Sequence, residues 1–415
     1  MTMRDESGGG AALRAFLPML LCGCLIAAAT MGVRSAFGLF TDPLILDKGW
    51  TREDYALAMA LQNLCWGIGT PLAGTIVDRF GPVPAFAGGG LLYALGLGLL
   101  PFAGSPLEML LTGGVMVGFG QGAASHFIVL SAFARRLPAT HRPWALGIGT
   151  AAASFGQFAF VPLGQAVIDL HGWSTAALAL AAMLATVPLL GLVFLRPGRV
   201  ATAGTARADR LPALAAVRWA FSHPSYLWLF TGFFVCGFQL AFITIHLPPY
   251  LGDVGADPSL AAWAIGVVGL FNIVGSYLSG LLSGRMPKRL LLSLIYFFRG
   301  LAIAHFLVLP VTPVTVLAFA AVMGLLWLST VPPTSDLIAA MFGTGNIATL
   351  FGLVFLSHQV GSFLGVWLGG VLYEATGSYD AVWWLTVALA MFAALVHLPI
   401  SERPAPRPAA FRAGG

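Results

Sequence analysis

Residues 31–44 read MGVRSAFGLFTDPL, and residues 236–249 read CGFQLAFITIHLPP. The second stretch follows the first at a distance of 205 positions, as the step from Gly32 to Gly237 shows. At this spacing four pairs of residues are identical: Gly32 and Gly237, Ala36 and Ala241, Phe37 and Phe242, and Pro43 and Pro248. The two stretches therefore indicate a chain built from two similar halves.

Two more segments recur near the same spacing. Residues 163–172 (LGQAVIDLHG) match residues 368–377 (LGGVLYEATG) at an offset of 205. Residues 74–81 (GTIVDRFG) match residues 280–287 (GLLSGRMP) at an offset of 206. Three matches at nearly one offset argue against coincidence and favour an internal repeat.

The composition places these halves in a lipid bilayer. Hydrophobic residues make up 58% of the 415 residues and charged residues only 9%, whereas soluble proteins carry about 25% charged residues. The 51 glycines and 26 prolines are tolerated in membrane helices, where small residues let backbones approach and neighbouring helices satisfy broken backbone bonds. We therefore expect a polytopic helical membrane protein.

Apolar runs of about 20 residues, the length that crosses a bilayer as a helix, occur twelve times along the chain. The first run is too long for the core of a signal peptide, so we keep it as a span. The expected spans are 15–40, 55–77, 83–104, 108–133, 144–168, 173–195, 224–249, 260–282, 289–310, 313–335, 346–372 and 379–399.

Loop charges predict the orientation of these spans. Of the 21 basic residues, 17 fall before the first span or in loops on that same side, and only Lys48 and Arg52 lie on the other side. By the positive-inside rule both termini are cytoplasmic, in the inner (plasma) membrane of the cell. Because topology accounts for the net charge of +5, no nucleic-acid partner is needed.

Because each half has six spans, an even number, both halves have the same orientation. An axis along the membrane normal relates the two halves. We expect an N-terminal six-helix bundle at 1–195, a cytoplasmic linker at 196–223, and a C-terminal six-helix bundle with a short tail at 224–415. Two such halves around a central cavity suit rocking between inward-open and outward-open states.

The chain resembles the major facilitator superfamily over nearly its whole length. The best motif is Gly74-xxx-Asp78-Arg79-Phe80-Gly81, whose second copy keeps Arg285 but lacks the aspartate. In that superfamily the motif implies a cytoplasmic latch between helices, formed here by Gly74, Asp78, Arg79, Gly81 and Arg285. The physical basis is a carboxylate near a helix end held by an arginine. The alternative is a basic loop that only sets topology.

Within the superfamily the chain is similar to the monocarboxylate transporter and oxalate/formate antiporter group. The residues that carry this similarity are Gly49-Trp50-Thr51-Arg52-Glu53, the Gly172-Trp173 turn, and the segment from Gly352 to His358. The Asp-xxx-Arg pair of monocarboxylate transporters falls on Asn272 and Ser276 here. This departure puts the familiar proton-and-anion pair of that group in doubt.

Arg34 is the main candidate for holding a substrate. A guanidinium inside a membrane must be paired, hydrated or facing a cavity, and in a carrier it can bind a carboxylate in bidentate fashion. Its position resembles that of the embedded lysine of monocarboxylate transporters, and its repeat partner is the polar Gln239. The alternative is a snorkelling arginine that reaches the outer interface.

Four other polar residues are candidates for the cavity. His358 matches, by its spacing from Gly352, the lysine with which oxalate/formate antiporters bind an anion, and a histidine binds an anion only when it is protonated. His126, Gln157 and Asn272 complete the predicted substrate site. For each, hydrogen bonding between helices is the competing explanation.

Arg299 lies near the middle of its span. It either contacts substrate or pairs with backbone carbonyls or an acid of a neighbouring helix.

The sequence thus predicts a secondary transporter of a small organic anion such as a monocarboxylate, with protons as a possible coupling ion. An efflux carrier for a neutral or amphipathic compound is the alternative. Motifs for a membrane enzyme, such as Gly-x-Ser-x-Gly or His-Glu-x-x-His, are missing. No cofactor or metal is expected, and the protein should function as a monomer.

Overall fold

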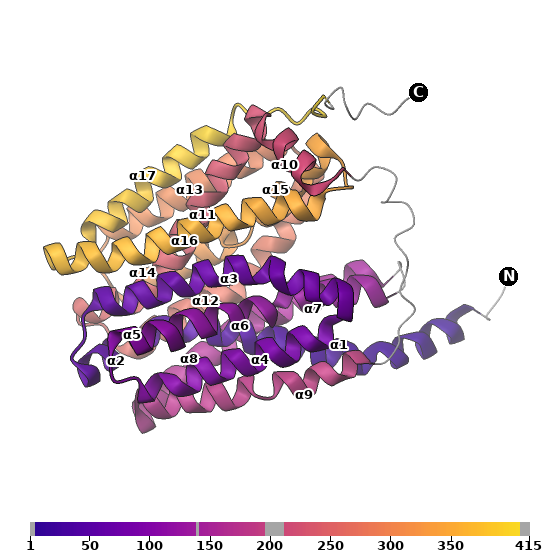
Figure 1. Ribbon diagram of the computed structural model, residues 1–415. Helices are drawn as coiled ribbons and strands as arrows, with labels where there is room; N and C mark the ends of the chain where they lie inside the picture. The colour runs from indigo at the N-terminus through magenta and orange to yellow at the C-terminus, as the bar shows by residue number, and fades with distance from the viewer. Residues whose placement is uncertain (1–4, 138–140, 196–210, 407–415) are drawn as a thin grey trace.

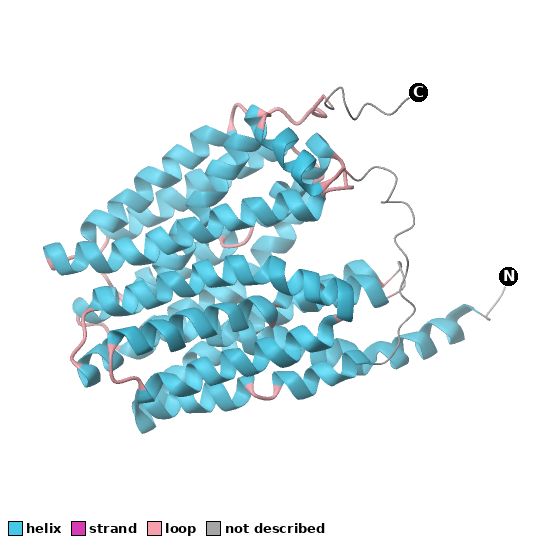
Figure 2. Cartoon of the chain, in the orientation of Figure 1, coloured by secondary structure: helices cyan, strands magenta, loops and turns pink. Residues whose placement is uncertain are grey.

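In the computed structural model the chain folds as a bundle of long helices, with no strand in residues 5–137, 141–195 and 211–406, which are the residues that the structure describes (Figure 2). The longer elements of the first half are α1 (Asp5–Ala36), α2 (Thr41–Lys48), α3 (Arg52–Phe80), α4 (Pro82–Leu99), α6 (Val117–Ala123), α7 (His126–Arg136) and α8 (Arg142–Leu184). Those of the second half are α11 (Pro224–Asp253), α12 (Pro258–Ser283), α13 (Lys288–Val308), α14 (Pro313–Leu326), α15 (Val331–Phe342), α16 (Ile347–Thr376) and α17 (Asp380–His397). Short elements complete the chain: η1 (Phe37–Phe40), η2 (Leu100–Phe102), α5 (Pro106–Met109), the π-helical η3 (Leu110–Met116), α9 (Val187–Gly191), η4 (Leu192–Leu195) and α10 (Ala213–Phe221).

These elements form twelve membrane-spanning helices. Ten helical stretches are long and apolar enough to cross a membrane. One of them, Trp144–Leu195, holds two spans, because Gly172 has a φ of +81° and turns the chain back inside α8. The remaining span is α3, which is less apolar because Gln62 and Asn63 lie near its middle. The expected fold of two parallel six-helix repeats is confirmed.

The two repeats pack their helices in the same way. In the first half Gly156 of α8 meets the backbone of Ala28 in α1, where an added Cβ would lie 2.0 Å from the carbonyl oxygen. In the second half Gly361 of α16 meets the backbone of Phe234 in α11, and an added Cβ would again lie 2.0 Å from the carbonyl oxygen. Gly361 stands 205 positions after Gly156, so the offset of the sequence repeat also separates two equivalent close contacts between helices.

We expect Gly361→Val to destabilise the protein strongly, because three added methyl-sized groups would press α16 away from α11 and overpacking of this kind typically costs about 1–3 kcal/mol or more. Thermal unfolding of the detergent-solubilised protein measures the loss. The matched control is Gly88→Val on α4, where an added Cβ has open space. An equal drop in melting temperature for both variants would contradict the claim of close packing at Gly361.

The bundle has two ends, which we name by the position of the chain termini. The terminal face holds the start of α1 and the end of α17, whereas the opposite face holds α2 and the connection between α11 and α12 (Figure 1). In each half one span is broken midway: α6 gives way to α7 at Ala124–Ser125, and α14 gives way to α15 after Leu326. The N-cap residues of α7 and α15 are Ser125 and Thr330, again 205 positions apart.

Candidate functional site

Arg34 lies near the end of α1 and turns its guanidinium towards α3. One Nη donates to the side-chain oxygen of Asn63 at 3.4 Å, and the guanidinium carbon lies 4.7 Å from the centroid of the Trp66 ring. The residue is half-buried. Among the described residues no carboxylate lies within ion-pair distance of it. An arginine inside a bundle needs a counter-ion, water or a cavity, and the described residues supply no counter-ion here.

Several buried polar atoms of α3, of α6 and of the start of α7 lack a hydrogen-bond partner in the described part of the chain. They are Nε1 of Trp66, both side-chain polar atoms of Gln121, Oγ of Ser125 and Nδ1 of His126. Arg34 lies close enough to His126 for their charges to interact. Because an unmet buried polar atom costs about 1–3 kcal/mol, this concentration indicates groups that pair with water or a ligand.

A chain of hydrogen bonds leads from Arg34 to His358 in the other half. Asn63, which accepts from Arg34, also offers its backbone oxygen to Nε2 of Gln359 at 3.0 Å. Oε1 of Gln359 in turn lies 3.0 Å from Nδ1 of His358. Two of the residues predicted to bind substrate are thus connected across the interface between α3 and α16.

Aromatic rings line the same interface. Phe355 of α16 packs edge-on against Trp66 and against Phe127, with ring centroids 5.4 Å apart in both pairs. Its other neighbour is the His358 ring, stacked at 5.7 Å. Since Phe127 and Phe355 are half-buried, they form an apolar wall next to the polar groups around Arg34.

Gln239 does not join this group. Its side chain is fully buried and donates from Nε2 to the carbonyl of Thr386 in α17 at 3.2 Å. The repeat pairs Gln239 with Arg34, but α11 directs the Gln239 amide towards α17 inside its own half. We therefore leave Gln239 out of the proposed site.

Gln157 and Asn272 join the two halves instead of lying next to Arg34. Nε2 of Gln157 in α8 donates to the carbonyl of Ile265 in α12 at 2.9 Å. Asn272 in α12 donates to the hydroxyl of Ser154 in α8 at 2.9 Å, and its oxygen accepts from the backbone N–H of Leu328 at 3.0 Å. Both amides are well paired here, so their role in this conformation is to hold α8 against α12.

Arg299 stabilises the broken span of the second half. Its Nε donates to the carbonyl of Leu326 at 3.0 Å, and its terminal nitrogens donate to the carbonyls of Leu326 and Trp327 and to the sulfur of Cys236. These carbonyls are left over where α14 ends, so the guanidinium satisfies them. Of the two possibilities for Arg299, pairing with backbone carbonyls is the one observed.

We expect Arg299→Leu to lower the melting temperature markedly, because two buried carbonyl groups would lose their donors at about 1–3 kcal/mol each. Binding or uptake per folded molecule should change far less. Thermal unfolding and uptake measured on the same preparation separate the two effects. Normal stability with lost uptake would instead assign Arg299 to transport.

The predicted latch residues lie at the terminal face, and the contact there differs from the expected one. Asp78 pairs with Arg135 at the end of α7, and not with its neighbour Arg79, whose guanidinium lies 5.1 Å from the Phe80 ring. Gly81 has a φ of +81°, which favours glycine and allows α4 to start directly. Asp78 and Arg135 are both largely exposed, which limits the strength of the pair.

In the second copy of the motif a hydrogen bond takes the place of this ion pair. Ser283 of α12 donates to the carboxylate of Asp336 in α15 at 2.5 Å, which links the same two spans of the repeat. Within the described chain Arg285 makes a backbone hydrogen bond to Leu282 and no side-chain hydrogen bond or ion pair. Around Gly74 and Gly280 an added Cβ would have open space. The two copies therefore act inside their own halves in this conformation.

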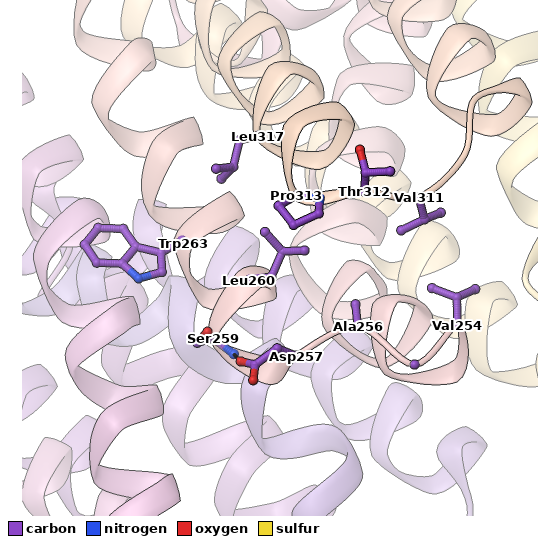
Figure 3. A pocket seen from close by; sticks show the side chains of 11 residues that line it. Val254, Ala256, Asp257, Ser259, Leu260, Trp263, Val311, Thr312, Pro313 and Leu317 are labelled. Atoms are coloured by element: carbon purple, nitrogen blue, oxygen red, sulfur yellow. Dashed lines mark hydrogen bonds between the residues drawn. The ribbon is translucent and has the colours of Figure 1, made fainter.

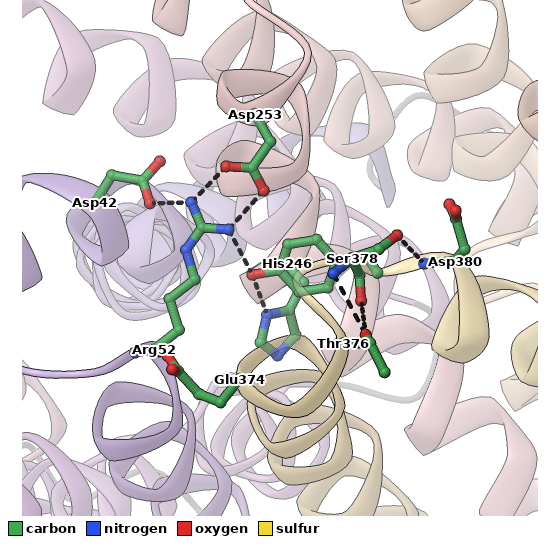
Figure 4. Close-up of polar contacts among 9 residues, drawn as sticks. Asp42, Arg52, His246, Asp253, Glu374, Thr376, Ser378 and Asp380 are labelled. Carbon is green, nitrogen blue, oxygen red and sulfur yellow. Dashed lines mark hydrogen bonds and ion pairs between the residues drawn. The ribbon is translucent and has the colours of Figure 1, made fainter.

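Arg52 is the centre of the contacts that close the opposite face (Figure 4). Its two terminal nitrogens donate to the two oxygens of Asp253 at 2.6 and 2.7 Å, and one also donates to Asp42 at 2.9 Å. Its guanidinium carbon lies 4.1 Å from the Tyr373 ring. Its backbone N–H donates to Glu374 at 2.9 Å. Residues from α2, α3, α11 and α16 thus meet at one side chain.

From the sequence, Arg52 is interpreted as a loop charge and as part of the segment from Gly49 to Glu53 that carries the family similarity, and no contact is predicted for it. A signal was present, because Arg52 is one of just two basic residues expected on that side while Asp42 and Asp253 lie at span ends on the same side. The pairing could not be read from the sequence, since Arg52 and Asp253 are 201 positions apart.

A separate pocket of about 460 Å³ lies on the opposite face between the start of α12 and the start of α14 (Figure 3). Leu260, Trp263 and Pro313 are among the side chains that line it. Asp257 at its edge accepts hydrogen bonds from the side chain and backbone of Ser259, which lower the pKa of the Asp257 carboxyl. The pocket contains none of the residues around Arg34.

The fold defines a class: a polytopic membrane protein made of two six-helix halves. The family model that matches is that of the Major Facilitator Superfamily, over residues 20–366. The chain belongs to this superfamily, and it is therefore a membrane transporter and not an enzyme.

Curated relatives are similar over most of their length. Monocarboxylate transporter 13 of Bos taurus is 28% identical over 367 residues, which cover 85% of this chain and 82% of the relative. The uncharacterized MFS-type transporter YcxA of Bacillus subtilis (strain 168) is 26% identical, with 92% and 94% covered. Monocarboxylate transporter 4 of Mus musculus is 26% identical, with 91% and 82% covered.

Solved structures of the superfamily share the fold. A D-xylose-proton symporter superposes with a TM-score of 0.71 at 14% identity, covering 95% of this chain and 98% of the symporter. A bacterial homolog of the human lysosomal transporter Spinster, in an inward-facing and unoccupied conformation, gives a TM-score of 0.70 at 18% identity, covering 94% and 98%.

Proposed function

We propose that the protein transports a small organic anion of the monocarboxylate type, and that Arg34 holds its carboxylate. The observation that carries this proposal is the half-buried guanidinium of Arg34, which lacks an acidic partner among the described residues. A carboxylate is the planar, bidentate partner that a guanidinium binds best. The relatives that are monocarboxylate transporters support the same substrate class.

Orientation follows from the loop charges. With 17 of 21 basic residues on the side of the termini, the terminal face is cytoplasmic and the face closed by Arg52 looks outwards. Around Gly74, Gly147, Gly280 and Gly352, towards the cytoplasmic ends of four spans, an added Cβ has open space. This conformation, closed outside, is one of two between which the halves rock during alternating access.

His358 is the proposed site where a proton joins the substrate. It lies at the far end of the hydrogen-bond chain from Arg34 through Asn63 and Gln359, and a histidine changes its charge in the physiological pH range. A protonated imidazole would add a second positive charge beside the bound anion. Substrate and proton would then cross together.

The test is uptake by the purified protein in proteoliposomes, with a panel of labelled short monocarboxylates and dicarboxylates. Saturable monocarboxylate uptake that rises with an inward proton gradient is the expected result. Transport of neutral or amphipathic compounds, with no carboxylate moved under any gradient, would replace the proposal by the efflux alternative. Uptake that does not respond to the gradient would contradict proton coupling and the role of His358, and it would leave the rest of the proposal standing.

A further inference from the structure

Several buried hydrogen-bond donors converge on the sulfur of Cys236, near the middle of α11. One terminal nitrogen of Arg299 donates to this sulfur at 3.4 Å, and the hydroxyl of Thr330 also lies 3.4 Å from it. The Tyr296 hydroxyl interacts electrostatically with Cys236 and has no hydrogen-bond partner in the described chain. All four residues are at most 1% exposed. Because a neutral thiol is only a weak acceptor, this arrangement of donors fits an anionic sulfur.

Arg299 needs a counter-ion, and the described residues place no carboxylate within ion-pair distance of it. A charge that is fully withdrawn from water is costly unless an opposite charge lies beside it. The acidic groups that the Arg299 guanidinium contacts are the Cys236 thiol and, across its ring face, Tyr296 at 5.2 Å. A thiol ionises more readily than a phenol, so the sulfur is the group better able to supply the negative charge.

His358 of α16 connects this sulfur to the interior of the carrier. The helices α11 and α16 touch here, because a Cβ added to Gly237 would clash with the backbone oxygen of His358. The imidazole is within hydrogen-bonding reach of the Cys236 sulfur. The side-chain nitrogen of Gln359 donates to Asn63, so the Gln359 oxygen faces Nδ1 of His358 and requires a proton there. Nε2 is then the ring nitrogen that can gain or lose a proton.

Another titratable group packs on this part of α11, namely His397 of α17. A Cβ added to Gly232, one turn before Cys236, would clash with the His397 ring. The ring stacks on that of Tyr296 at 5.0 Å, and its Nδ1 donates to a backbone carbonyl of its own helix at 2.7 Å. His397 therefore packs against Tyr296 and backbone, whereas Arg299, Tyr296 and His358 face the sulfur.

We propose that Cys236 is a thiolate in the proton-free carrier and that the transported proton is shared between its sulfur and His358. The inference rests on the proposed function for its role in transport, and it adds a second proton-binding group to His358. His358 is 7% exposed and takes the proton from the interior, whereas Cys236 is 1% exposed and exchanges it with His358. The proton binds a lone pair of Nε2 or of the sulfur, so no other bond forms or breaks.

The charges of this cluster explain how a proton and an anion would be coupled. In the proton-free carrier the thiolate and Arg299 compensate each other. Uptake of one proton leaves one net positive charge, and the hydrogen-bond chain through Gln359 and Asn63 joins this region to Arg34. Because coupling between two binding events is reciprocal, the bound proton favours the anion and the bound anion favours the proton.

The first test is infrared spectroscopy of the S–H stretch, which only a protonated thiol gives. Cys22, Cys24 and Cys65 are replaced by alanine, so that Cys236 is the one contributor of the four cysteines. We expect the band to be missing at mildly alkaline pH and to appear as the pH is lowered to the mildly acidic range. A band that is present, or missing, over the whole range would overturn the inference. The measurement needs no substrate, so it holds whether or not the protein moves a carboxylate.

The second test is the pH profile of uptake by Cys236→Ser, which keeps a small hydrogen-bonding side chain but cannot become an anion in this range. Without the negative sulfur, protonation of His358 is less favourable, so half-maximal uptake should move to lower pH by about 1–3 pH units. Cys65→Ser is the matched control, because Cys65 is also buried but packs against Gly118 of the first half. An unmoved profile in Cys236→Ser, or an equal shift in Cys65→Ser, would overturn the inference.

Exchange of labelled for unlabelled substrate at constant pH needs no net release of a proton and should persist in both serine variants. If Cys236→Ser fails to exchange, the variant is misfolded and the infrared band decides. No uptake of any carboxylate by the unaltered protein would overturn the proposed function, and the infrared band would still decide the state of Cys236.

Discussion

Arg34→Ala is expected to reduce carboxylate uptake by about 30-fold or more while the protein still folds and reaches the membrane. Truncating one partner of a buried, hydrogen-bonded charge pair costs about 2–5 kcal/mol, and each 1.4 kcal/mol is a factor of ten in affinity. Folding should be spared, because among the described residues the Arg34 side chain makes only one long hydrogen bond and a ring contact.

The charge and the shape of Arg34 can be separated. Arg34→Lys keeps the positive charge but loses the planar fork that binds both carboxylate oxygens, so it should retain partial uptake with a raised KM. Arg34→Gln keeps hydrogen-bond donors without the charge and should resemble Arg34→Ala. Uptake and binding are measured on proteoliposomes with matched protein content. Unchanged uptake in Arg34→Ala would show that the guanidinium is structural and that the anion binds elsewhere.

Much of the fold could be predicted because its determinants are local. Apolar runs mark the spans, loop arginines mark the sides, and the 205-residue offset marks the halves. The offset also predicts packing, as Gly156 and Gly361 show by meeting equivalent neighbours. Each of these properties depends on residue type and spacing alone, which a sequence contains in full.

The site was predicted less completely, since it depends on the rotation of each helix. Each residue turns the helix by about 100°, so a small error in helix rotation changes which neighbour a side chain meets. Arg34 could be singled out because any arginine inside a membrane needs a partner. Gln239 could not be assigned correctly, because only the structure shows its amide against Thr386. The break at Ser125 had one signal, the glycines at 118, 120 and 122 that weaken the helix before it.

The residues predicted to form the latch show the same limit. Asp78 does hold an arginine, but its partner is Arg135 from the next broken span and not the adjacent Arg79. Sequence motifs report which residues recur at a spacing, whereas a partner 57 positions away is fixed by how α3 and α7 pack. Arg79 and Arg285 therefore remain candidates for contacts in the other conformation.

Arg52→Ala is expected to shift the protein towards the conformation that is open on the face closed by Arg52. The side chain joins Asp42 of the first half to Asp253 of the second and packs on Tyr373. Its removal deletes the bidentate pair and leaves two carboxylates near each other without their shared cation. Contacts of this kind couple by about 0.5–3 kcal/mol, so the ratio of open to closed molecules should rise by a factor between about 2 and 140.

Distance measurements between spin labels at Leu46 and Val254 detect this shift, since both side chains are exposed on that face and belong to different halves. The label-to-label distance should lengthen or broaden in Arg52→Ala and, more weakly, in Asp253→Asn, which keeps a hydrogen-bond acceptor but loses the charge. Lys288→Gln is the matched control, because it removes an ion pair with Glu402 inside the second half at the terminal face.

A double-mutant cycle decides whether the Arg52–Asp253 pair itself closes this face. If it does, Asp253→Asn should add little once Arg52 is already alanine, because the shared interaction is gone. Fully additive shifts would mean that Arg52 acts through Asp42 and the tyrosines instead. An unchanged distance distribution in Arg52→Ala would show that helix packing alone closes the face. The close approach of Gly38 in η1 to the backbone of Thr244 in α11 is the contact that would then account for the closure. Because closing and opening must both be reversible in a carrier, a partly exposed ion pair of moderate strength suits this position better than a fully buried one.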